Sequence, residues 1–183
     1  MLKAAFVRTV GEADRFYVTR SDGSEARWSF ATYGEALPHD LVHLVVESAF
    51  GLSRGFWGRV DEGVDPKVVN DEANRKGGAD KYAAYGPDRT ELLQAEALAN
   101  AHWWDDSMDA GIEEACALMG APAPPPVAPV HIREIRAVLR ALSARWRALR
   151  PKGALALTFD RAAPRRGFDR LALGLVVNAG DKT

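Results

Sequence analysis

The chain has 183 residues, of which 47% are hydrophobic and 27% are charged, and its formal net charge is −1 at pH 7. This globular composition suits one sizeable core and excludes a membrane-spanning helix, because no apolar run approaches the ~20 residues that such a helix needs. The start of the chain alternates like a strand, without the apolar core of a secretion signal, and the single Cys116 excludes an intramolecular disulfide. We therefore predict one cytoplasmic domain over residues 1–183.

The first fifty residues predict a strand meander followed by a buried helix. The stretches AAFVRTV, DRFYVTR and EARWSF alternate like strands, and an Asp-Gly turn at residues 22–23 separates the second from the third. The pattern then takes a helical period in LPHDLVHLVVESAFGL. Pro38 suits the first helical position and Gly51 suits the position just past the end.

Three further helices are predicted downstream. DRTELLQAEALANAHWW begins after the candidate cap Asp88, and SMDAGIEEACALMG follows it. Residues 121–129, APAPPPVAP, form a stiff extended connector, because a polyproline segment keeps its length without internal hydrogen bonds. HIREIRAVLRALSARWRALR then gives the clearest helical pattern, with apolar residues on one stripe and arginines opposite.

The last thirty residues complete the predicted fold. GALALTFD and RLALGLVVN alternate like two strands around the turn RAAPRRGF, and as a carboxyl-terminal hairpin they would extend the amino-terminal meander. The fold class predicted is α+β. It consists of a mostly antiparallel sheet of about five strands with helices packed on one face.

The helix over residues 39–50 carries a narrow polar strip. On a wheel of ~100° per residue, Leu and Val side chains occupy most of the circumference, and His43, Glu47 and Asp40 share the remaining arc, with His39 at its boundary. Buried polar groups need hydrogen-bond partners, a ligand or the solvent of a cleft. The strip is therefore either a metal site or a set of core histidines bonded to carbonyl and carboxylate groups.

Residues 39–43 read H-D-L-V-H, which resembles the H-E-x-x-H motif of zinc metallopeptidases with Asp40 in the place of the Glu. Two His at i and i+4 lie on one helix face and can direct ring nitrogens at one ion. The resemblance implies that His39 and His43 are metal ligands and that Asp40 is the general base. Because Asp has a shorter reach than Glu, the resemblance supports metal binding more than proteolysis. Glu47 is either a third ligand or the carboxylate that orients His43.

A further ligand must come from another element. On the helix after Asp88, the apolar face that includes Leu92 and Ala95 also holds His102 and Asp106, so we predict His102 as a metal ligand with His39 and His43. The predicted cofactor is a divalent metal, with zinc as the first candidate, and the alternative is that no cofactor binds. Asp40 and Glu47 are the candidate catalytic residues of a metal-dependent hydrolase.

The carboxyl-terminal part of the chain is basic. Residues 130–183 hold 12 Lys and Arg against 4 Asp and Glu, whereas residues 1–129 hold 12 against 21. The two parts can attract each other within the chain, or the arginine stripe can dock a protein or anionic partner. That stripe consists of Arg133, Arg136, Arg140 and Arg147. No nucleic-acid motif accompanies it, so it favours a protein over a nucleic acid, and the second functional hypothesis is a non-enzymatic interaction domain.

Overall fold

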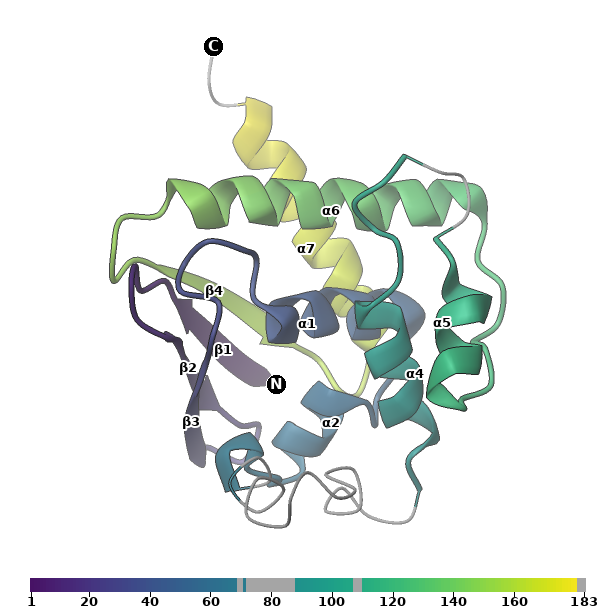
Figure 1. The fold of residues 1–183 in the computed structure, drawn as a ribbon, viewed down its shortest axis with the longest axis horizontal. Helices are drawn as coiled ribbons and strands as arrows, with labels where there is room; N and C mark the ends of the chain where they lie inside the picture. Colours follow the sequence, from purple (N-terminus) through teal and green to yellow (C-terminus); the bar gives the residue numbers. More distant parts are fainter. Residues whose placement is uncertain (69–70, 72–87, 107–109, 181–183) are drawn as a thin grey trace.

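The computed structural model describes residues 1–68, 71, 88–106 and 110–180 of the chain. Its sheet contains β1 (Leu2–Val7), β2 (Asp14–Thr19), β3 (Glu25–Phe30) and β4 (Ala154–Phe159) in the order β3-β2-β1-β4. Every neighbouring pair is antiparallel. The amino-terminal meander predicted from the sequence is thus present, and the last strand pairs with the first (Figure 1).

The strands form where apolar and polar residues alternate, because a strand with one buried face needs a period of two. The inward positions include Leu2, Phe6, Phe16 and Trp28, all of which are buried, while their sequence neighbours face outward. The hairpin between β2 and β3 turns at Gly23, whose φ of +87° is the left-handed conformation that glycine adopts without steric cost. One face of the sheet therefore contributes its apolar side chains to the hydrophobic core.

Helices pack on that buried face and on one another (Figure 1). They are α1 (His39–Phe50), α2 (Phe56–Asp61), α4 (Thr90–Ala99), α5 (Ile112–Met119), α6 (Pro129–Ala148) and α7 (Pro164–Gly180). Helix α1 lies at the centre and contacts α2, α4, α6 and α7. Helix α5 lies on the side of α4 away from the sheet (Figure 1). Within the described residues, none of these helices combines the length and the apolar character needed to cross a membrane. The α+β class with an antiparallel sheet is confirmed.

The two ends of α1 lie where Pro38 and Gly51 predicted them, to within one residue. Pro38 precedes the first helical residue, and Gly51 follows the last with a φ of +75°. The backbone N–H groups of Gly51 and Leu52 donate to the carbonyls of Ser48 and Glu47, which closes the final turn in the manner of a glycine-terminated helix. Ten of its residues are buried, so α1 is held by packing on nearly all sides.

The predicted carboxyl-terminal hairpin is wrong in its second half. The stretch RLALGLVVN belongs to α7, so the described sheet has four strands and not five. Phe168, Leu171 and Leu175 follow one another at spacings of three and four residues, and all three pack against the core. That spacing has a helical period, and Pro164 at the first helical position fixes the start. The alternation of Leu with Ala or Gly over residues 171–175 fits the period of a strand as well as the period of a helix.

Candidate metal centre

Helix α1 places His39 and His43 on one face, one turn apart. Their rings lie 4.7 Å apart between centroids and almost perpendicular, at 89°. The side chain of His43 is 1% exposed and that of His39, at the first helical position, is 31% exposed, whereas the residues that follow His39 in α1 are buried. The i and i+4 spacing in the sequence therefore yields the side-by-side histidines that it predicted.

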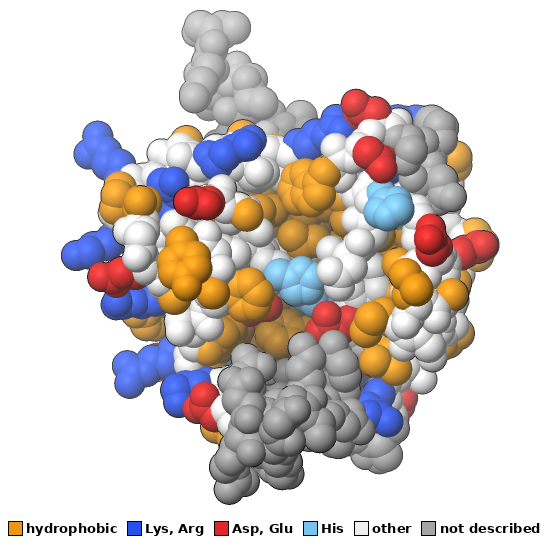
Figure 2. Space-filling view, in the orientation of Figure 1, with side chains coloured by type: hydrophobic (Ala, Val, Ile, Leu, Met, Phe, Trp, Pro, Cys, Tyr) orange, Lys and Arg blue, Asp and Glu red, His pale blue; other side chains and the backbone are white. Residues whose placement is uncertain are grey.

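Helix α4 brings a carboxylate to this pair. Glu96 Oε2 lies 3.6 Å from Nε2 of His39 and 3.6 Å from Nε2 of His43. Within the described part of the chain, His39, His43 and Glu96 thus form a group of side chains whose ligating atoms all lie within 4.8 Å of one another. Figure 2 shows imidazole and carboxylate side chains reaching the surface side by side near the middle of the molecule.

The two separations from Glu96 are longer than ordinary hydrogen bonds. Two ligands of a tetrahedral zinc ion with bonds of about 2.0 to 2.1 Å lie roughly 3.3 to 3.5 Å apart, whereas hydrogen-bonded N and O atoms lie about 2.7 to 3.2 Å apart. The two 3.6 Å distances from Glu96 are close to the former value.

Glu47 lies behind His43 and not among the three ligating atoms. Its Oε1 is 3.2 Å from Nδ1 of His43, which leaves Nε2 of the same ring facing Glu96. Its two oxygens also accept the backbone N–H groups of Phe56 and Trp57, each at 3.0 Å, at the start of α2. This arrangement orients His43 through its second nitrogen, as outer carboxylates do in known metal sites.

Gly55 makes the position of Glu47 possible. A Cβ atom at residue 55 would lie 2.7 Å from the carboxyl carbon and from Oε2 of Glu47, and 3.1 Å from Cβ of Ala95. Any larger residue would therefore displace the carboxylate or the turn before α2.

Burial and the neighbouring carboxylates shift the pKa of His43 in opposite directions. Burial lowers the pKa of the imidazole, but the hydrogen bonds and charges of Glu47 and Glu96 outweigh it and raise the pKa from 6.5 to about 10. Burial raises the pKa of the Glu47 carboxyl, and the contacts with His43, Trp57 and Phe56 oppose that shift. The two carboxylates therefore favour the protonated form of His43.

Asp40 adds a third carboxylate beside the two histidines. It is 7% exposed, and its Oδ2 accepts the indole N–H of Trp28 at 2.7 Å. Burial raises the pKa of this carboxyl, and the indole bond and the nearby histidines oppose the shift. Asp40 does not belong to the group of ligating atoms, so it remains a candidate for proton transfer or for holding the start of α1.

His102 lies apart from His39 and His43. Helix α4 ends at Ala99, so the helical wheel that placed His102 on its apolar face does not extend that far. The backbone N–H of His102 donates to the carbonyl of Ala110, and its exposed ring lies against Gly111 at the start of α5. The structure therefore brings Glu96, and not the predicted His102, to the histidine pair.

Glu96 could have been found from the sequence. It is four residues after Leu92 and three before Ala99, so it lies on the apolar face that was used to select His102. Its side chain is 15% exposed. A carboxylate in the middle of a buried helical face is a stronger signal than a histidine near the end of the pattern, where helices often stop early.

The arginine stripe of α6 is partly used within the chain. Arg136 is buried and donates to the carbonyl of His102 and to Oδ1 of Asp105. Arg140 donates to Oδ1 of Asp106 at 2.6 Å. These bonds fasten the loop after α4 to α6, and they agree with attraction between the basic and acidic parts of the chain. Arg133 and Arg147 are exposed.

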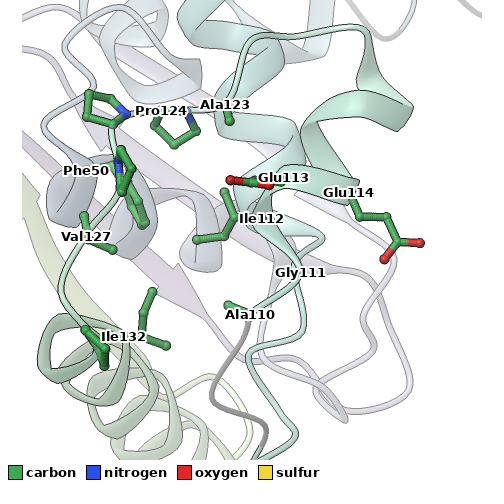
Figure 3. A pocket seen from close by; sticks show the side chains of 13 residues that line it. Phe50, Ala110, Gly111, Ile112, Glu113, Glu114, Ala123, Pro124, Val127 and Ile132 are labelled. Carbon is green, nitrogen blue, oxygen red and sulfur yellow. The ribbon is translucent and has the colours of Figure 1, made fainter.

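A separate cavity of about 620 Å³ lies at the other end of α1 (Figure 3). Phe50, the start of α5, the proline-rich connector and the start of α6 line it. Neither the histidine pair nor Glu96 is among its lining residues. It is therefore separate from the cluster of His39, His43 and Glu96.

A scan of protein-family models and searches of curated proteins and of solved structures gave no significant match to this chain. The chemistry of the site is therefore inferred from its own side chains. Two imidazole nitrogens and one carboxylate oxygen are ligands that zinc and related divalent ions accept. The described residues around them add Asp40 and Glu47, two further buried carboxyl groups.

Proposed function

We propose that the chain binds one divalent metal ion, with zinc as the first candidate, through Nε2 of His39, Nε2 of His43 and an oxygen of Glu96. The observation that carries the proposal is the convergence of these three atoms within 4.8 Å. Support comes from Glu47, which occupies the second nitrogen of His43 and so leaves Nε2 for the ion.

Three protein ligands leave a coordination position for water or a substrate, which is typical of catalytic zinc and not of structural zinc. The exposure of His39 and Glu96 would give that position access to solvent. We therefore extend the proposal to a small metal-dependent hydrolase, in which the bound ion would activate water. Asp40 is the candidate for accepting a proton, and Glu47 is a positioning residue.

Metal content tests the proposal. The full chain is purified, stripped with a chelator, supplied in turn with Zn, Mn, Fe, Co and Ni, and analysed for metal per chain by mass spectrometry. We expect about one zinc per chain in the parent protein and none in the variant H39A/H43A. Circular dichroism checks that the variant folds. If the parent protein retains none of these metals in stoichiometric amount, the proposal is lost.

A further inference from the structure

The cavity beside the proline-rich connector has the character of a small-molecule site. Its volume of about 620 Å³ lies within the range of roughly 300 to 1,000 Å³ that ligand pockets occupy. Its walls are mainly apolar, and they include Phe50, Ile112, Val127 and Ile132. Ligand pockets typically combine such walls with a small number of placed polar groups that fix the orientation of the ligand.

The connector makes one wall rigid. Pro124, Pro125 and Pro126 line the cavity in an extended segment, and proline restricts the backbone without internal hydrogen bonds. The side-chain amide of Gln94 on α4 donates to the carbonyl of Pro122 at 2.8 Å and ties the segment to the core. A ligand would therefore meet a wall that is already formed, which lowers the entropic cost of binding.

The polar side chains of the cavity are acceptors. Glu113 and Glu114 are its charged lining residues, and no Lys, Arg or His is among the described residues that line it. Figure 3 shows Glu113 turned toward the cavity beside Ile112, whereas Glu114 points away. The prolines strengthen this bias, because each has a carbonyl acceptor and no N–H donor. The backbone N–H groups at the start of α5 are donors, and the two glutamates at that helix end complement them.

We propose that this cavity binds a small organic ammonium ion with an apolar or aromatic body. The ammonium group would lie at Glu113, where it meets a carboxylate. The body would lie against Phe50, Ile112 and Val127, and an aromatic ring also attracts a cation over its face. Charge complementarity excludes a carboxylate of the same shape, which would be repelled by Glu113.

Three probes of nearly equal size test whether the cavity prefers a positively charged ligand. They are 2-phenylethylammonium, 2-phenylethanol and 3-phenylpropanoate, each titrated into the full chain at pH 7 and followed by NMR chemical shifts or calorimetry. We expect the ammonium ion to bind about three- to tenfold more tightly than the alcohol, as one partly exposed ion pair would allow. The carboxylate should not bind. Equal binding of the carboxylate, or no binding of the ammonium ion at millimolar concentration, would overturn the proposal.

Two neighbouring glutamates supply a matched pair of variants. E113Q removes the charge that faces the cavity and keeps the shape, and it should weaken ammonium binding about three- to tenfold. E114Q makes the same change on the side chain that points away, and it should leave binding within twofold. Equal losses in both variants would contradict a site at Glu113. H39A/H43A should bind the ammonium ion like the parent protein, so this result is separate from the fate of the metal proposal.

Discussion

The two ends of helix α1 present opposite kinds of site. Along the face that begins at His39, the environment is polar and largely buried, with His43 and Glu47 at 1% and 0% exposure and bonded to each other. At the last residue, Phe50 meets an apolar cavity whose wall is a proline-rich segment. Burying an ionisable group costs free energy unless the group is paired or binds a cation. An apolar cavity with a rigid wall carries no such cost. The first end is therefore defined by paired buried groups, and the second by an apolar wall with the charged side chain of Glu113 beside it.

Removing Glu47 should have the largest effect. E47A leaves His43 buried without its carboxylate and leaves the N–H groups of Phe56 and Trp57 without their acceptor. The free energy of unfolding should fall by about 3 to 5 kcal/mol, which is the usual cost of breaking a buried ion pair. Urea denaturation of the metal-free protein measures it. E114A, at an exposed helical position, is the control and should cost less than about 0.5 kcal/mol.

A methyl group at Gly55 should disturb the same carboxylate less severely. In G55A the new Cβ would lie 2.7 Å from Glu47, so the carboxylate or the turn must shift, and the protein should lose about 1 to 3 kcal/mol. G174A in α7 is the matched control, since nothing lies within 4 Å of the Cβ it adds. Alanine should be neutral or slightly stabilising there. Equal unfolding midpoints for the two variants would contradict the packing described around Glu47.

Metal-free stability should depend on pH through His43. Its pKa is 6.5 in an unfolded chain and about 10 when folded, so the folded state binds the proton more tightly. The resulting stabilisation is fully present below pH 6.5 and is lost as the pH rises toward 10. Urea denaturation at several pH values should show this decline in the parent protein. In H43Q the slope over the same range should be smaller, and an unchanged slope would assign the pH dependence to other groups.

The smallest effect is expected at the other end of α1. Pro124 is buried in the connector wall, and P124A should lower stability by roughly 0.4 to 1 kcal/mol, because alanine frees the unfolded chain. P125A changes an exposed neighbour and tests whether burial adds to that cost. Thermal unfolding of both variants measures the difference. A loss at P124A as large as that of E47A would remove the contrast between the two ends.

The sequence predicted the parts of the fold where one period dominates. Strict alternation identified the strands of the meander, and Pro38 with Gly51 bounded α1. It failed in α7, where Leu alternating with small residues fits both a strand and a helix, and only packing of Phe168 and Leu175 on the core decides. The local sequence pattern cannot decide between a strand and a helix in such a stretch.

The candidate site was predictable on one helix and not between helices. The i and i+4 spacing alone placed His39 beside His43. The third side chain depends on where α4 ends and how it packs on α1, and the early end at Ala99 carries His102 away from the pair. Glu47 could be assigned only once α2 was seen to donate its first N–H groups to that carboxylate.

Zinc titration of the E96Q and H102A variants tests the metal centre most directly. Isothermal calorimetry on the stripped full chain should give about one site in the parent protein. H102A should keep that site with an affinity within twofold of the parent, because His102 lies apart from the ligating atoms. E96Q should lose at least tenfold in affinity. A variant E96Q that binds zinc like the parent protein, with H102A unable to bind it, would contradict the site proposed between α1 and α4.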